Sequence, residues 1–382
     1  MRVAYITTYD ARDIANWSGI GFYMAQSLKE QSIQVDLIGS VRNKYSPLSI
    51  LFKSKEYLYK YLLNQNYLHY REPALLRNYA NQAAKQLSQL EADIVLSPGS
   101  IPIAYLECSQ PIVFWTDATF AGMIDFYPEF SNLCQESIRN QNAMEQSALD
   151  RCKLAIYSSE WAAKTAIENY KVDPNKVKVV PFGANIECQR NIDDIKVLVE
   201  SRPSDKCKLL FLGVNWLRKG GNIAFQVAKE LNSSGLETEL TIVGCPPMVD
   251  EPLPNFIRSL GFISKSTKEG REQIDRLIAE SHFLILPSIA DCTPLVFCEA
   301  NSFGVPCLST KLGGIPTIVR DNVNGKLFNQ ESDISEYCQY ISSLFVRYSE
   351  YKKLAMSAFD EYQSRLNWSV AGKTVKEMLR SI

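Results

Sequence analysis

Short apolar runs separated by stretches of helical periodicity recur along the whole chain. In the first half, helical stretches are expected at 20–30, 140–152 and 159–170. Continuous apolar runs between helices are typical of strands that are buried on both faces of a parallel sheet. The pattern predicts about six such strands, at 3–7, 33–39, 93–97, 112–115, 154–158 and 177–181.

The same alternation then starts again, with helical stretches at 221–235, 271–281 and 295–304. Two successive series of this kind predict an α/β protein of two doubly wound domains, each with a parallel sheet. The joint is expected near 183–205, where the sequence becomes polar. Strands of the second series are expected at 209–213, 240–244, 256–261, 283–288 and 306–310.

Length and composition agree with two globular domains. The chain has 382 residues, of which 46% are hydrophobic, and 41 Lys and Arg balance 42 Asp and Glu. This near-neutral charge argues against a general nucleic-acid binder. The ten cysteines contain no CxxC pair, so reduced and buried thiols are expected. No signal peptide is visible and no apolar run reaches the roughly 20 residues that span a bilayer, which predicts a cytoplasmic protein.

The strongest candidate chemistry lies in PSIADCTPLVFCEANSFGVP, at 287–306. Asp291 is expected in the loop after a strand, with Pro294 in the first turn of the following helix and Glu299 further along it. Ligands of doubly wound sheets bind beyond the carboxyl ends of the strands, where the helix amides can hold phosphate oxygens. A carboxylate at Glu299 can accept hydrogen bonds from a diol. The alternative is an acid near a helix start and a solvated Glu.

A second motif places two cations before a helix. Arg218 and Lys219 precede the glycine-opened helix that begins near Gly221. Cations avoid helix N-termini unless something anionic lies nearby. The pattern therefore predicts a diphosphate site, with a basic loop in water as the alternative.

Two glycine-containing loops complete the set. Gly19 and Gly21 follow the first strand but lack the third glycine of a GxGxxG motif, so a phosphate-approach loop and an ordinary helix entry stay equally open. Gly313 and Gly314 follow a later strand, and their amides are expected at the ligand side. Residues 324–325 read as a turn.

Together these motifs resemble the family 4 retaining glycosyltransferases of the glycosyl transferases group 1, along nearly the whole chain. The RKGG loop, the acidic pair, the GGIP loop and the NG turn occur in the family's order. The resemblance implies a GT-B fold, in which two Rossmann-like domains face each other across a cleft. It implies an acceptor-side domain at 1–188, a donor-binding domain at 189–364, and a final helix at 365–382 that packs back on the first domain.

The resemblance also implies site residues. Arg218 and Lys219 would hold the donor diphosphate, Asp291 the donor sugar and Glu299 the ribose hydroxyls. Asp117 is carried over as a catalytic residue, although a threonine precedes it where many members have histidine. Asp291 itself stands where the family usually has glutamate. Further donor contacts are implied for Gly19, Gly21, Phe262, Ile263, Thr293, Pro294, Leu295, Gly313 and Gly314.

The implied reaction is transfer of a hexose from a UDP or GDP sugar to a hydroxyl of a saccharide or lipid-linked acceptor, as in polysaccharide biosynthesis, with the anomeric configuration retained. Preorganised cations would stabilise the leaving diphosphate. Because the chain has no Asp-x-Asp motif, neither a metal nor another cofactor is expected. The absence of an evident nucleophile favours a front-face mechanism.

Two other function classes stay open. A nucleotide-sugar-binding protein without transferase activity fits the departures at Thr116 and Asp291. A nicotinamide-dependent oxidoreductase would also use doubly wound sheets, but the incomplete glycine fingerprint and the lack of a proton-relay histidine argue against it.

Residues 42–85 combine eight Lys or Arg with only two acids and eight aromatic side chains. Mixed cations and tyrosines suit the headgroup region of an anionic membrane, and they equally suit a sugar-binding acceptor cleft. A helical insertion whose tyrosines pack on the first domain is the alternative. The apolar residues show no single helical stripe in the sequence, which disfavours a pure amphipathic anchor. Peripheral attachment at the inner face of a membrane is thus one expectation for this cytoplasmic protein.

Overall fold

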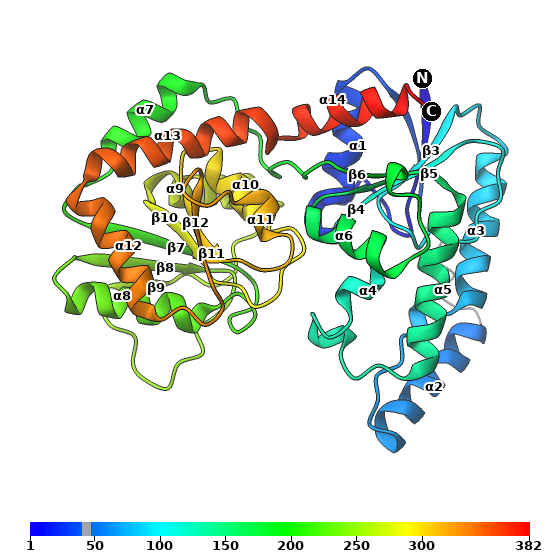
Figure 1. The fold of residues 1–382 in the computed structure, drawn as a ribbon, viewed down its shortest axis with the longest axis horizontal. Helices are drawn as coiled ribbons and strands as arrows, with labels where there is room; N and C mark the ends of the chain where they lie inside the picture. The colour runs from blue at the N-terminus through cyan, green and yellow to red at the C-terminus, as the bar shows by residue number, and fades with distance from the viewer. Residues whose placement is uncertain (40–46) are drawn as a thin grey trace. The chain divides into compact units, whose positions relative to one another are not determined.

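The computed structural model describes residues 1–39 and 47–382. The chain forms two compact units, which are described separately. The first unit contains Met1–Pro181 together with Ala371–Ile382, and the second contains Phe182–Val370. Each unit is built around a six-stranded parallel sheet with helices packed on it (Figure 1).

The sheet of the first unit has the strand order β2-β1-β3-β4-β5-β6, and every pair is parallel. All six strands predicted for this half are present. The central strands β3 and β4 are buried along their whole length, which explains their continuous apolar sequence. The strands are β1 Arg2–Ile6, β2 Gln34–Ile38, β3 Ile94–Ser97, β4 Ile112–Thr116, β5 Cys152–Tyr157 and β6 Val177–Val179.

The helices of the first unit include two that periodicity alone did not predict, α2 and α3. The chain's last helix, α14, joins this unit from Ala371 onward. A Cβ at Gly372 would lie 2.7 Å from the carbonyl oxygen of Ser27, so α14 needs glycine to pack closely there. The helices are α1 Ile20–Glu30, α2 Pro47–Leu62, α3 Pro73–Leu87, α4 Phe120–Met123, α5 Gln135–Arg151, α6 Glu160–Asn169 and α14 Trp368–Leu379.

The sheet of the second unit has the strand order β12-β11-β10-β7-β8-β9, also parallel throughout. Its edge strand β12 was not predicted, because residues 324–325 read only as a turn. A Cβ at Gly325 would lie 2.0 Å from the carbonyl oxygen of Cys307, so this glycine lets β12 approach β11. The strands are β7 Cys207–Leu212, β8 Thr238–Val243, β9 Ile257–Ser259, β10 Phe283–Leu286, β11 Cys307–Thr310 and β12 Gly325–Phe328.

The polar stretch that was expected only as a joint contains a helix, α7. Asn191 and Asp194 form a reciprocal capping box at its start. Ile195 and Val199, four residues apart, are the side chains that α7 buries. The helices of the second unit are α7 Ile192–Ser201, α8 Gly221–Ser233, α9 Lys268–Glu280, α10 Leu295–Asn301, α11 Ile315–Ile318, α12 Ile334–Val346 and α13 Tyr348–Arg365.

The strand orders define one switch point in each sheet. In the first unit it lies between β1 and β3, and in the second between β7 and β10. At such a point the connections on either side run to opposite faces of the sheet, which leaves a crevice at the carboxyl ends of the two strands. The loops after β7 and β10 are therefore the first place to look for a site in the second unit.

Glu145 on α5 is a carboxyl group buried inside the first unit, with 2% of its surface exposed. The Ser100 hydroxyl donates to Glu145 Oε2 at 2.7 Å. Glu145 Oε1 and the hydroxyl of Tyr157 are buried without a hydrogen-bond partner among the described residues. Burial raises the pKa of Glu145 to about 7, and the hydrogen bond from Ser100 opposes that shift.

This pKa predicts a pH-dependent stability. Because the folded-state pKa lies above the ordinary value of 4.5, the folded protein binds the extra proton between these two values. The protonated carboxyl group stabilises the fold fully at a pH below 4.5. This stabilisation, on the order of 3 kcal/mol, is lost as the pH rises through about 7. Glu145→Gln should flatten the fall in Tm across this window. Glu168→Gln, at a side chain that is 57% exposed, is the control. Equal slopes in Glu145→Gln and the parent would contradict the assignment.

Candidate functional site

The loops that follow β7 and β10 are tied together by their own side chains. Lys219 Nζ donates to Asp291 Oδ2, and these two side chains are only 11% and 8% exposed. Arg218 Nη1 donates to the carbonyl oxygen of Ala290 at 2.7 Å. The backbone N–H of Ile289 donates to the carbonyl oxygen of Arg218 at 2.9 Å. The structure thus brings the basic pair and the first acid together at the switch point.

Two glycines let the basic loop lie this close to its neighbour. Gly220, which precedes α8, has a φ of +74°, and a Cβ there would lie 2.0 Å from the carbonyl oxygen of Pro287. A Cβ at Gly221 would lie 2.2 Å from the ring of Trp216. A larger residue at 220 would push the loop away from the end of β10, and one at 221 would displace Trp216 within the loop, so the GG of the RKGG motif is a packing requirement.

The charges at this point are arranged to hold an anion. The ammonium group of Lys219 has three N–H donors, and its hydrogen bond to Asp291 uses one of them. The next residues open α8, whose 13 residues give its amino end a partial positive charge. Breaking a buried ion pair leaves an uncompensated charge, so Lys219 and Asp291 depend on each other for their positions.

The second glycine loop also meets the acid. The backbone N–H of Gly314 donates to the carbonyl oxygen of Asp291 at 3.0 Å. Gly313 before it has a φ of +53°, in the left-handed region that favours glycine. The short helix α10 begins just after Asp291. The structure therefore gathers Arg218, Lys219, Asp291, Thr293, Pro294, Leu295, Gly313 and Gly314 around one edge of the second sheet.

Glu299 is not a solvated side chain, which removes one of the alternatives considered for it. It is 2% exposed, and Lys265 Nζ donates to its Oε2 at 2.5 Å. Lys265 was not predicted, because it lies in an unremarkable polar stretch 34 residues from Glu299. Phe262, in the same loop, is 72% exposed, whereas Ile263 packs against the core of the second unit.

Two of the three candidates in the first unit, Gly21 and Asp117, lie near a tyrosine that sequence analysis missed, Tyr9. A Cβ at Gly21 would lie 2.3 Å from the hydroxyl oxygen of Tyr9, so Gly21 makes room for that ring. The Tyr9 hydroxyl is buried without a partner among the described residues. Burial, and then the charge of Asp117, raise the pKa of Tyr9. Gly19, with a φ of +82°, directly precedes α1.

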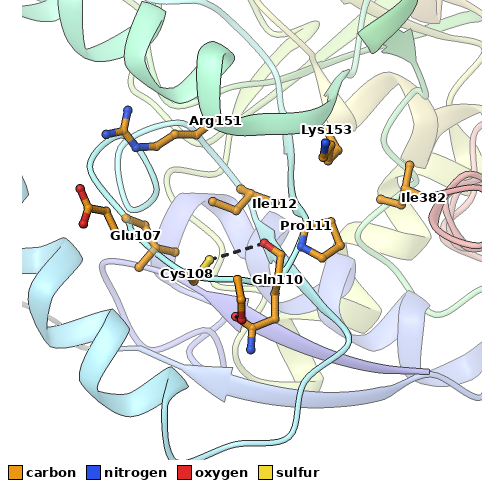
Figure 2. Close-up of a pocket in the computed structure, with 10 residues that line it drawn as sticks. Glu107, Cys108, Gln110, Pro111, Ile112, Arg151, Lys153 and Ile382 are labelled. Carbon is orange, nitrogen blue, oxygen red and sulfur yellow. Dashed lines mark hydrogen bonds between the residues drawn. The ribbon is translucent and has the colours of Figure 1, made fainter.

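A cavity of about 610 Å³ in the first unit lies away from these candidates (Figure 2). Its lining includes Ile112, the first residue of β4, and Arg151, which directly precedes β5. It therefore opens at the amino ends of these strands, whereas Asp117 follows the carboxyl end of β4. Since doubly wound sheets bind ligands at the carboxyl ends, this cavity is not part of the candidate site.

Comparison with known sequences finds a family match within the second unit. Residues 206–346 match the family described as glycosyl transferases group 1. The chain is 24% identical over 234 residues to the D-inositol 3-phosphate glycosyltransferase of Mycobacterium marinum, which covers 59% of this chain and 49% of that protein. It is 24% identical over 194 residues to the UDP-Gal:alpha-D-GlcNAc-diphosphoundecaprenol alpha-1,3-galactosyltransferase of Escherichia coli, covering 49% of each. The chain thus spans about half the length of these curated relatives.

Comparison with solved structures extends the likeness to the whole chain. A sucrose-phosphate synthase from Thermosynechococcus elongatus has a TM-score of 0.71 at 14% identity, covering 100% of this chain and 98% of that one. Anabaena Alr3699/HepE in complex with UDP and glucose has a TM-score of 0.62 at 16% identity, covering 100% of both. With the two doubly wound units, these likenesses show that the chain has the GT-B fold, and its residues 206–346 match the glycosyl transferases group 1 family.

Proposed function

We propose that this protein is a retaining glycosyltransferase that moves a hexose from a nucleotide-diphosphate sugar to a hydroxyl of an acceptor. The observation that carries the proposal is the buried pair of Lys219 and Asp291 at the switch point between β7 and β10. The names of the relatives support the reaction class. The UDP–galactose donor named for the Escherichia coli enzyme, and the UDP and glucose bound by the Anabaena protein, favour a UDP-hexose over a GDP-hexose.

In this proposal the cations stabilise the charge that develops when the diphosphate leaves. As the bond between the anomeric carbon and the phosphate oxygen breaks, negative charge builds up on the diphosphate. Lys219, Arg218 and the amino end of α8 supply fixed positive charge and donors at that position. These groups take the place of a bridging metal, so the proposal includes no metal and no other cofactor.

The proposal places the sugar beside Asp291 and the nucleoside beside Glu299. Asp291 Oδ2 is engaged by Lys219, which suits a carboxylate that orients sugar hydroxyls better than one that attacks the anomeric carbon. Retention then follows a front-face course. The acceptor oxygen bonds to the anomeric carbon on the face that the diphosphate leaves, and the acceptor proton passes to the departing phosphate oxygen.

The acceptor in the proposal is a saccharide or a lipid-linked saccharide of polysaccharide biosynthesis. A lipid-linked acceptor is named for the Escherichia coli relative. Among the helices that the structure describes, none is long and apolar enough to cross a membrane. We propose peripheral contact with a membrane, at its inner face, through residues within 42–85, and a cytoplasmic location for the enzyme.

Loss of the Lys219 ammonium should slow donor cleavage. Transfer of glucose from UDP-glucose to water needs no acceptor, and Lys219→Ala should lower its rate by roughly 10²–10³, as expected for one transition-state donor. The parent rate should persist in a metal chelator. The control is Lys229→Ala, which removes a surface lysine of α8 paired with Glu251. A near-parental rate in folded Lys219→Ala would contradict the proposal, and a parent that binds UDP-glucose without cleaving it would indicate a binding protein.

Glu299 should act on nucleotide affinity. Glu299→Gln keeps the shape and an acceptor for Lys265 but loses the charge that strengthens hydrogen bonds to ribose hydroxyls. Its Kd for UDP should rise by roughly 10- to 100-fold, in line with about 1.5–3 kcal/mol for a charged hydrogen bond. Calorimetric titration with UDP measures this. Glu280→Gln, at a side chain that is 53% exposed, should bind UDP as the parent does. Unchanged affinity in Glu299→Gln would place the ribose elsewhere.

A further inference from the structure

One face of α2 presents large apolar side chains to solvent. Their positions repeat at intervals of three, four and seven residues, so they lie along one side of the helix. The expectation of no single stripe concerned all the apolar residues of 42–85, and Phe52 and Tyr59 do lie on other sides of α2, so the stripe is the exposed subset of these residues. The face, called here the α2 face, consists of Ile50, Leu51, Tyr57, Leu58, Tyr61 and Leu62, which are 50% to 75% exposed.

The opposite side of α2 is fixed to the first unit. Lys55 Nζ lies 2.5 Å from Glu136 Oε1 on α5, and the Tyr59 hydroxyl donates to Glu136 Oε2 at 3.1 Å. The ring of Tyr59 stacks on that of Tyr67, which is 2% exposed, with 5.2 Å between centroids. These contacts set the rotation of the helix about its axis. The α2 face is consequently held outward, and Figure 1 shows α2 at the lower end of this unit, near α5.

The tyrosines of α2 accordingly divide into two groups. Tyr59 packs inward, as the alternative of a packed helical insertion required. Tyr57 and Tyr61 instead stack on each other at the outer surface, with 5.9 Å between their centroids. Packing on the first domain therefore accounts for only part of this aromatic segment.

The charge beside the α2 face is positive. Lys53 and Lys60, seven residues apart, are both exposed and border the same edge of the stripe. The acids of the segment are engaged within the protein, since Glu56 Oε2 lies 2.8 Å from His69 Nδ1 and Glu72 accepts from the Tyr67 hydroxyl at 2.5 Å. α2 has three lysines against one acid, Glu56, so the surface around the stripe is net positive.

We propose that the α2 face lies in the plane of an anionic lipid membrane, with Leu58 and Leu62 in the acyl boundary and Lys53 and Lys60 at the headgroups. Apolar side chains and tyrosines beside lysines fit this interface. The 16 residues of α2 are fewer than the roughly 20 that cross a bilayer, so the helix lies on the membrane. The α2 face thus specifies the surface for the proposed peripheral contact. Membrane binding by this face does not depend on the proposed function, whereas its use in reaching a lipid-linked acceptor does.

A second copy of the chain fits this surface less well than lipid does. A two-fold interface pairs a patch with itself, so the partner would have to offer acids to Lys53 and Lys60. The α2 face is apolar, and the one acid of α2, Glu56, lies 2.8 Å from His69 Nδ1. Anionic phospholipid supplies both the apolar layer and the negative charge.

Vesicle flotation of the full chain tests the charge requirement. The parent should bind vesicles of phosphatidylglycerol and phosphatidylcholine, bind phosphatidylcholine alone much less, and be released by salt. Lys53→Gln/Lys60→Gln should weaken binding about 30-fold, because each lysine at an anionic surface adds about fivefold. Lys164→Gln/Lys268→Gln, at lysines that are 71% and 77% exposed, is the control. A parent that does not bind anionic vesicles overturns the proposal.

The apolar requirement is tested in the same assay. Leu58→Ser/Leu62→Ser should weaken vesicle binding by at least about tenfold. Val197→Ser/Val346→Ser, at valines that are 70% and 85% exposed, should not. The proposal is overturned if Leu58→Ser/Leu62→Ser binds vesicles as the parent does. It is also overturned if the parent is a dimer in solution and this variant is a monomer. UDP-glucose hydrolysis should stay parental in all four variants. A protein that binds vesicles without hydrolysing the donor would refute the proposed function alone.

Discussion

The candidate site depends on one buried ion pair, between Lys219 and Asp291. The strand order of the second sheet leaves a crevice between β7 and β10, but topology alone does not place a charge there. The pair does so by joining the loops that follow these strands. Gly220 allows the loops to meet, and the amide of Gly314 adds the third loop through the Asp291 carbonyl. The strand order, the close packing of the loops and the ion pair thus all act at the carboxyl ends of β7 and β10.

Two of the ion pairs in the second unit lie where different parts of the substrate are proposed to bind. Lys219 with Asp291 lies where the diphosphate and sugar are proposed, and Lys265 with Glu299 lies where the ribose is proposed. In the first unit, the α2 face offers a surface of different chemistry, with apolar and basic side chains held outward by the contacts of Lys55 and Tyr59. An enzyme that takes a water-soluble donor and a lipid-linked acceptor would need both kinds of surface.

Apolar patterning predicted the fold well, because strands buried on both faces leave continuous hydrophobic runs. It failed where other forces decide. The edge strand β12 begins at a glycine that the close approach to Cys307 requires, and α7 is a short helix that buries only two side chains. The stripe on α2 was missed because sequence periodicity does not reveal which face of a helix the tertiary contacts of Lys55 and Tyr59 turn inward.

The loop motifs led to the residues of the candidate site because each follows a strand end in the sequence. Lys265 and Tyr9 were not predicted, because no motif in the sequence marks them. Lys265 reaches Glu299 across 34 residues, and Tyr9 is recognised only through the space that Gly21 leaves for it. Contacts of this kind depend on how loops fold back, which neither periodicity nor motif spacing encodes.

The central claim is that the switch point between β7 and β10 holds the donor diphosphate. Backbone hydrogen exchange with and without UDP-glucose tests it most directly, because bound ligand protects the amides that it covers. The account predicts slower exchange in residues 213–221 and 289–299, with no change at the cavity around Ile112. Protection around that cavity, with unchanged exchange in both loops, would contradict the claim.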